Sequence, residues 1–144
     1  SAEPKFGMTK YTADVEGGDG LKTLLPKDDA ATVNWGTKWR TPTKEEFDEL
    51  LDETRCEWTW IPEKNGYIIK GIQTGKTIFL PIAGFRYKKE LYNATNSGSY
   101  WSSTLNNSVL DKSSAYEFGF NSVATNWIRS NRSGSRSVRA VTDY

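Results

Sequence analysis

The clearest pattern of hydrophobic and polar positions follows Thr43. Phe47, Leu50 and Leu51 recur at helical spacing and give one apolar face, with acidic residues on the remaining sides. Thr43 is a good N-cap, and Glu46, three residues later, completes a capping box. The pattern therefore predicts a helix that packs its apolar face on a sheet. We interpret its carboxylates as a solvated helix face and not as an active site.

A shorter helix is predicted upstream, over residues 28–34. Asp28 and Asp29 suit the positive end of a helix, and Gly36 is a typical residue to end it. Before this helix, weak apolar periodicity predicts a first strand at about residues 8–12. The N-terminal part of the chain is thus expected to contain one short strand and one short helix.

The pattern changes to β after residue 55. Three short runs rich in β-branched and aromatic residues are separated by turn residues. The predicted strands are residues 58–61, 67–72 and 77–82. Asn65-Gly66 between the first two is a strong hairpin signal.

Residues 91–136 differ in composition from the rest, because they are rich in Ser and Asn and poor in Lys and Glu. Short strands are still indicated inside this segment. Tyr116, Phe118 and Phe120 alternate with other residues, which predicts one apolar face and one open face. Further strand fragments are predicted at residues 100–101, 127–128 and 137–141. Two early helices and many later strands favour an α+β fold, which we expect to form a single domain over residues 1–144.

Charge and hydropathy narrow the range of partners. The 19 basic and 18 acidic side chains leave a formal net charge of +1, so nothing favours nucleic acid or an anionic membrane as a partner. No apolar run reaches the length of a membrane span, so we expect no direct membrane insertion. The chain is rich in aromatic residues, with six Trp, seven Tyr and six Phe, and most of these are expected to fill the core.

The residues needed for common catalytic sites are scarce. The chain has no His, which removes the commonest general base and the commonest metal ligand. Cys56 is the single cysteine, so an intrachain disulfide is excluded, and we interpret it as a buried hydrophobic residue. Acidic residues are also sparse in the C-terminal segment, where Asp111 is isolated. We expect no enzymatic activity, no cofactor and no bound metal.

Several phrases, taken in order, resemble a known protein family. They are Asp28-Asp29-Ala30-Ala31, Asn34-Trp35-Gly36, Trp39-Arg40-Thr41-Pro42-Thr43, Cys56-Glu57-Trp58-Thr59-Trp60, Ile78-Phe79-Leu80-Pro81-Ile82-Ala83-Gly84, Gly98-Ser99-Tyr100-Trp101-Ser102-Ser103-Thr104 and Ser137-Val138-Arg139-Ala140-Val141. Together they resemble the C-type-lectin-like domains of the formylglycine-generating-enzyme branch. Within that branch the chain is most similar to variable proteins of diversity-generating retroelements, especially those of gut Bacteroidales and their phages. The resemblance covers about residues 28–141.

The resemblance implies a C-type lectin-like fold. In that fold the N- and C-terminal strands pair, two helices flank short twisted antiparallel sheets, and a long, partly irregular C-terminal segment faces the ligand. Here that variable segment would span about residues 91–136. The enzymes of this branch use a pair of cysteines, and this chain has one, so the resemblance does not imply their chemistry. The chain departs from the family pattern at Ser135 and Ala140, where the family often has Gly and Pro.

In retroelement variable proteins, the variable positions descend from Asn codons whose adenines are rewritten. The residues after Trp127 belong to the set that such codons can reach, whereas Glu117 does not. Combining this with the strand alternation, we predict that ten residues lie largely on one exposed, ligand-binding face. They are Asn106, Asn107, Ser114, Glu117, Gly119, Asn126, Ile128, Ser130, Asn131 and Ser133. We interpret Trp101 and Trp127 as core or framework residues, and Arg139 as a structural ion-pair or hydrogen-bonding partner.

Three functional hypotheses follow. The favoured one is a display domain with a diversified surface that binds an unknown protein or glycan ligand, for adhesion or phage attachment, on a cell surface or a phage particle. The alternative is a non-diversified structural or adhesion domain of a bacterial surface protein. The third is an enzyme derived from the formylglycine-generating branch, against which the absence of His and of a cysteine pair counts.

Overall fold

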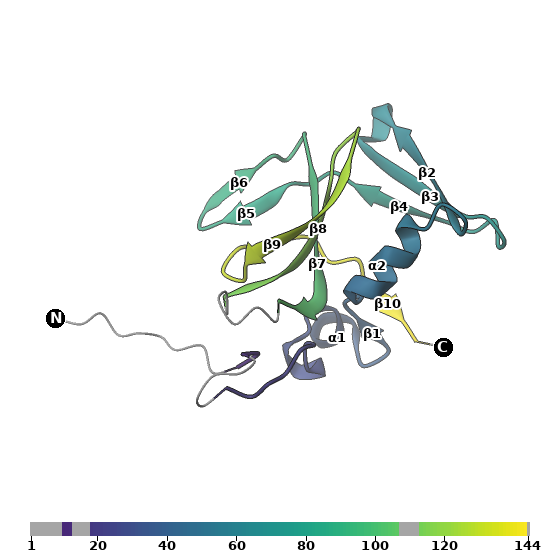
Figure 1. Cartoon of the computed structure of the whole chain (residues 1–144). Coiled ribbons are helices and arrows are strands. Elements are labelled where there is room, and N and C mark those ends of the chain that lie inside the picture. Colours follow the sequence, from purple (N-terminus) through teal and green to yellow (C-terminus); the bar gives the residue numbers. More distant parts are fainter. Residues whose placement is uncertain (1–9, 13–17, 107–112, 144) are drawn as a thin grey trace.

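The structure, a computed structural model, describes residues 10–12, 18–106 and 113–143 of the chain. Its helical elements are the 3-10 turns η1 (Pro26–Asp28) and η2 (Pro62–Lys64) and the α-helices α1 (Ala30–Trp35) and α2 (Lys44–Leu51). Its strands are β1 (Trp39–Arg40), β2 (Cys56–Ile61), β3 (Gly66–Gly71), β4 (Thr77–Pro81), β5 (Phe85–Tyr87), β6 (Glu90–Tyr92), β7 (Gly98–Leu105), β8 (Ser114–Phe120), β9 (Thr125–Asn131) and β10 (Val141–Thr142). Figure 1 shows their arrangement.

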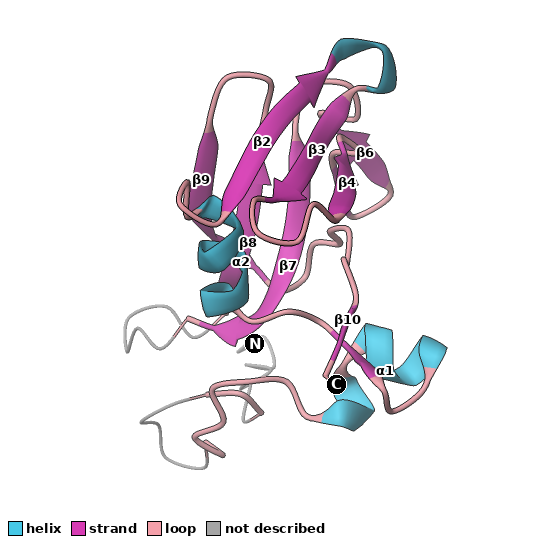
Figure 2. Ribbon diagram, turned by 90° about the vertical axis from the view of Figure 1, so that its right-hand side faces the viewer, coloured by secondary structure: helices cyan, strands magenta, loops and turns pink. Residues whose placement is uncertain are grey.

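The described strands form small antiparallel sheets, so the expected α+β class is confirmed. Two sheets are three-stranded, with the orders β2-β3-β4 and β7-β8-β9. The other two are the pairs β1-β10 and β5-β6. The β1-β10 pair joins the N-terminal part of the fold to its C-terminal end, with Trp39 opposite Thr142. Figure 2 shows α2 beside β2 and β8, and α1 beside the β1-β10 pair.

The core lies between the two three-stranded sheets and α2. It contains buried side chains from all three parts: Phe47, Ile69, Leu80, Ile82, Tyr100, Phe118 and Phe120. Phe47 stacks on Phe118, with ring centroids 5.0 Å apart. Cys56 is half-buried and packs against this cluster. The aromatic residues thus fill much of the core, as their number predicted.

Helix α2 forms as its sequence predicts. Thr43 accepts a hydrogen bond from the N–H of Glu46, and the Glu46 carboxylate accepts one from the N–H of Thr43, at 3.2 and 2.8 Å. This reciprocal pair satisfies two backbone donors that the helix itself cannot satisfy. Phe47 is buried, and Leu50 and Leu51 are half-buried against the core, which confirms the predicted packing.

Helix α1 begins slightly later than predicted. Residues 26–28 form a 3-10 turn, and Asp29 is the N-cap because its carboxylate accepts from the N–H of Ala31 at 2.8 Å. The helix ends at Gly36, as predicted, with a φ of 94°. The same carboxylate accepts from the N–H and hydroxyl of Thr41, both at 2.8 Å, and so ties α1 to the strand that follows.

Other predictions are confirmed in part. Strands β2 and β3 form the expected hairpin around Asn65, whose φ of 49° is left-handed. The predicted first strand is wrong for its described residues, because residues 10 and 11 form a turn, and residues 8–9 lie outside the described part. The predicted strand at 137–141 is limited to β10 and one isolated bridge at Ser137.

The segment expected to be partly irregular contains longer strands than predicted. Within residues 91–136, the described part includes β7, β8 and β9, which pair over most of their lengths. The short strand fragments expected at residues 100–101 and 127–128 are parts of β7 and β9, because the Ser and Asn residues of this segment occupy strands as well as turns. Among the helices of the described residues, none is both long and apolar enough to cross a membrane.

Candidate ligand-binding surface

Strand β9 lies at an edge of its sheet, where it pairs with β8 along its length and packs on the core through one tryptophan. Trp127 points inward, with its ring 5.8 Å from Phe47 and 5.4 Å from Phe118. Its indole N–H donates to Asp48 at 2.7 Å. The framework role predicted for Trp127 fits these contacts. Because strand neighbours alternate in direction, Ile128 points to the opposite side and is 43% exposed.

A tight turn follows β9 and exposes Ser133. The Asn131 side chain accepts from the N–H of Ser133 at 2.9 Å, and its backbone carbonyl accepts from the N–H of Gly134 at 3.2 Å. Gly134 is buried, and a Cβ on it would lie 1.9 Å from Nη1 of Arg136. A larger residue at this position would force the Arg136 side chain to shift, whereas the Ser133 side chain projects into solvent.

Residues 135–137 join β5 to β7. Arg86 and Ser135 exchange two backbone hydrogen bonds, at 2.9 and 2.8 Å. Ser137 accepts from the N–H of Trp101 and donates to the carbonyl of Ser99, both at 3.0 Å. This double pairing fixes the C-terminal segment and places the β5-β6 hairpin beside it.

Arg136 holds residues 135–137 against β8. Its Nε donates to the Glu117 carboxylate at 2.8 Å, and the two side chains are only 9% and 4% exposed. The guanidinium also lies over the rings of Phe85 and Trp101, at 4.6 and 4.9 Å from their centroids. Each charge is compensated inside the protein, so this pair supports the surface and is not free to bind a ligand.

The structure corrects the predicted ten-residue face. Four of its members are buried, namely Asn106, Ser114, Glu117 and Gly119. Asn126, Ile128, Asn131 and Ser133 are exposed, Ser130 is half-buried, and Asn107 lies outside the described residues. The prediction of one exposed face is thus wrong for the four buried positions.

Each buried position has an identifiable cover or partner. Asn106 donates to the Ser114 hydroxyl at 2.9 Å, and Glu117 is paired with Arg136. Gly119 lies beneath Ile128, because a Cβ on the glycine would be 2.9 Å from Cδ1 of that side chain. Alternation correctly placed Phe118 and Phe120 on the core face of β8 and Glu117 and Gly119 on the opposite face. It does not reveal which segment covers that opposite face.

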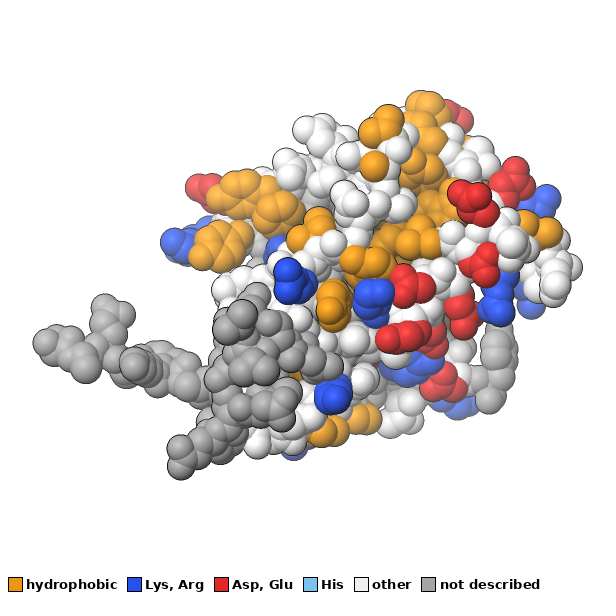
Figure 3. Space-filling view, in the orientation of Figure 1, with side chains coloured by type: hydrophobic (Ala, Val, Ile, Leu, Met, Phe, Trp, Pro, Cys, Tyr) orange, Lys and Arg blue, Asp and Glu red, His pale blue; other side chains and the backbone are white. Residues whose placement is uncertain are grey.

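The β5-β6 hairpin adds exposed apolar groups that the sequence analysis did not single out. Tyr87, Leu91 and Tyr92 are 44%, 48% and 39% exposed. Figure 3 shows hydrophobic side chains on this projecting hairpin, with charged groups at its tip. The aromatic and apolar residues on both sides of the Lys88-Lys89 turn are a signal that could have indicated such a hairpin.

A small pocket lies where the hairpin meets residues 135–137. Its volume is about 180 Å³, and its lining includes Phe85, Arg86, Leu91 and Arg136. Nearby, the Tyr92 hydroxyl donates to Glu90 at 2.8 Å, and this bond raises the pKa of Tyr92 above its ordinary value of 10.0. The phenol is thus neutral at physiological pH and can donate this hydrogen bond.

We call the five accessible predicted residues, Asn126, Ile128, Ser130, Asn131 and Ser133, the β9 surface. It combines amide and hydroxyl groups with one exposed apolar side chain, beside an aromatic hairpin. Such a set can form adaptable hydrogen bonds around apolar anchors. Within the described ranges, no three His, Cys, Asp or Glu side chains are grouped closely enough to hold a metal ion.

Neither a protein-family model, nor a curated protein, nor a solved structure matches this chain.

Proposed function

We propose that the protein is a binding domain that recognises a protein or glycan ligand through the β9 surface and the adjoining β5-β6 hairpin. In this proposal the domain has a C-type lectin-like fold and acts as a retroelement variable protein, displayed on a cell surface or a phage particle for adhesion or attachment. It binds its partner without catalysing a reaction.

The observation that carries the proposal is that, along residues 125–136, some side chains hold the segment in place and others contact solvent. Trp127 and Arg136 hold the segment in place, whereas Asn126, Ile128 and Ser133 contact solvent. Substitutions at exposed positions usually change stability by less than about 0.5 kcal/mol. The β9 surface can therefore change in sequence while its support stays fixed, which is what a diversified binding site requires.

A pair of displayed libraries tests this. One library randomises the five residues of the β9 surface, and the matched library randomises the four predicted residues that are buried: Asn106, Ser114, Glu117 and Gly119. We expect most members of the first library to resist protease as well as the parent, and most members of the second to be cleaved. Selection of the first library against an arbitrary protein such as lysozyme should then yield binders. Equal protease sensitivity of the two libraries, or a folded first library without binders, would contradict the proposal.

A second candidate is a non-diversified structural or adhesion module. It is favoured by the burial of Asn106, Ser114, Glu117 and Gly119, since buried positions with specific partners tolerate little change. The gene's surroundings separate the two candidates. A neighbouring reverse transcriptase gene and a near-repeat of the region encoding residues 99–137 are expected for a diversified protein and not for a structural module.

A further inference from the structure

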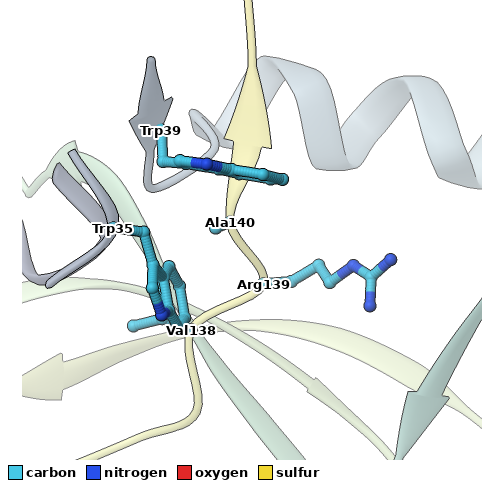
Figure 4. A pocket seen from close by; sticks show the side chains of 5 residues that line it. All are labelled: Trp35, Trp39, Val138, Arg139 and Ala140. Atoms are coloured by element: carbon cyan, nitrogen blue, oxygen red, sulfur yellow. The ribbon is translucent and has the colours of Figure 1, made fainter. Parts of the chain in front are cut away.

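A second surface, formed by the end of α1 and the start of β1, carries two exposed tryptophans. Trp35 ends α1 and Trp39 begins β1, and they are 58% and 40% exposed. Their ring centroids are 6.5 Å apart, and the ring planes meet at 70°. Together with Val138, Arg139 and Ala140 they line an open pocket of about 480 Å³. Figure 4 shows the Trp39 ring above, Trp35 at the lower left beside Val138, and the Arg139 side chain extending to the right, away from Trp35.

The turn between the two tryptophans is fixed by hydrogen bonds. Gly36 donates to Thr32 at 2.9 Å and accepts from the N–H of Trp39 at 3.0 Å, and the Thr32 hydroxyl donates to the carbonyl of Trp39 at 2.7 Å. The pairing of β1 with β10 places residues 138–140 next to this turn. The backbone that carries the two rings is therefore fixed by hydrogen bonds before any ligand arrives, which lowers the entropy cost of binding.

Among the described residues, the polar side-chain groups of the pocket are donors without hydrogen-bond partners. Within the described part of the chain, neither indole N–H of Trp35 and Trp39 nor the Arg139 guanidinium makes a hydrogen bond or ion pair. Because the Arg139 guanidinium has neither kind of partner among the described residues, its predicted role as a structural ion-pair or hydrogen-bonding partner is wrong. None of the five lining side chains is acidic. A matching ligand must therefore present acceptors and a negative charge, together with apolar surface for the rings.

The two inclined rings form an apolar corner with indole N–H donors at its margin. A planar aromatic ring fits the angle by stacking on one tryptophan and meeting the other edge to face. A pyranose ring presents axial C–H groups on its faces and can contact two rings that are inclined at 70°, and its hydroxyl oxygens can also accept from the indole N–H groups. A volume of about 480 Å³ lies within the range of about 300–1,000 Å³ typical of small-molecule sites.

From these observations we infer that Trp35, Trp39 and Arg139 form a binding site for an acidic saccharide, whose carboxylate pairs with the guanidinium and whose sugar ring packs on the indoles. This site shares no lining residue with the β9 surface or with the pocket beside the β5-β6 hairpin. It stands whether or not the β9 surface binds a partner.

The six indole N–H groups of the chain allow a direct test by NMR, because each gives its own signal. The probe is trigalacturonic acid, and Trp35→Phe and Trp39→Phe assign two of the signals. We expect the probe to shift these two signals and to leave the other four in place. Its neutral methyl ester, which has the same sugar skeleton, and adenosine monophosphate serve as comparison ligands and should bind more weakly.

Variants then test the role of each group. Arg139→Gln should weaken binding of the acidic trisaccharide by roughly tenfold or more, because a charge-assisted hydrogen bond is lost. Trp35→Ala should weaken it to a similar degree, with the four remaining core and framework indole signals confirming the fold. Lys38→Gln is the matched control, since Lys38 is exposed in the same turn but does not line the pocket.

Five results would overturn the inference. The first is the absence of any shift in the two signals, and the second is equal binding of the methyl ester. The third is a loss with Lys38→Gln as large as that with Arg139→Gln, which would indicate general charge attraction. The fourth is tighter binding of adenosine monophosphate than of the acidic trisaccharide. The fifth is that the signals shift with protein concentration alone, which would indicate self-association.

Discussion

Replacing Glu117 with Gln tests the support beneath the β9 surface. Glu117 and Arg136 are 4% and 9% exposed, so water cannot replace the lost charge. Glutamine keeps the shape and can still accept the hydrogen bond from Nε, but it leaves the guanidinium buried without a counter-charge. Nη1 of Arg136 already lacks a hydrogen-bond partner among the described residues. The remaining attraction to Phe85 and Trp101 does not offset the loss.

The expected cost follows from the distance and the burial. Two unit charges about 4 Å apart attract by about 4 kcal/mol at an effective dielectric constant of about 20. Removing one partner of a buried pair typically destabilises a protein by about 3–5 kcal/mol. We therefore expect Glu117→Gln to lower the free energy of unfolding by about 3 kcal/mol, as measured by urea denaturation followed by circular dichroism.

Two further variants make the measurement specific. Glu57→Gln removes a carboxylate from an exposed strand position without a described partner, and it should change stability by less than about 0.5 kcal/mol. The double variant Glu117→Gln/Arg136→Met removes both charges and keeps a side chain that packs on aromatic rings. It should recover at least half of the loss. If Glu117→Gln lowers the free energy of unfolding no more than Glu57→Gln does, the reasoning is wrong. It is also wrong if the double variant loses as much stability as Glu117→Gln and Arg136→Met lose when their separate effects are added.

Three other outcomes are expected. Phe47→Ala should destabilise the fold by about 3–5 kcal/mol in urea denaturation, since Phe47 is 2% exposed, whereas Leu50→Ala should cost less because Leu50 is only half-buried. Burial raises the pKa of Tyr100 to about 12, above its ordinary value of 10.0. Between these two values the unfolded chain loses the phenol proton and the folded protein keeps it. The contribution of Tyr100 to stability is therefore present below pH 10 and is lost as the pH rises towards 12. Stability measured across that interval should fall less steeply in Tyr100→Phe than in the parent. Melting curves with and without chelator should coincide, and a fall of several degrees on chelation would reveal a metal site.

The parts of the fold that short-range interactions specify were predictable. The capping box of α2 involves residues three positions apart, and Gly36 ends α1 through its own backbone freedom. The hairpin around Asn65 likewise depends on one turn and its two flanking strands. In each case the residues that decide the structure are neighbours in the chain, so their pattern carries the information.

The candidate site was only partly predictable. Periodicity correctly placed Phe118 and Phe120 on the core side of β8, and Ile128 on an exposed side of β9. It failed at Glu117 because the partner of that carboxylate is 19 residues away and arrives from another segment. Alternation assigns residues to the two faces of a strand, but whether the second face meets water depends on which distant segment crosses it.

The sequence by itself therefore determined the α+β class, the caps, the hairpin and the alternation of the strands, because these follow from interactions between nearby residues. Only the tertiary structure decided that residues 135–137 pair with both β5 and β7, that Arg136 neutralises Glu117, and that β1 and β10 bring Arg139 to Trp35 and Trp39. The physical reason is that burial, charge compensation and pocket formation depend on distances in space, which a linear pattern does not contain.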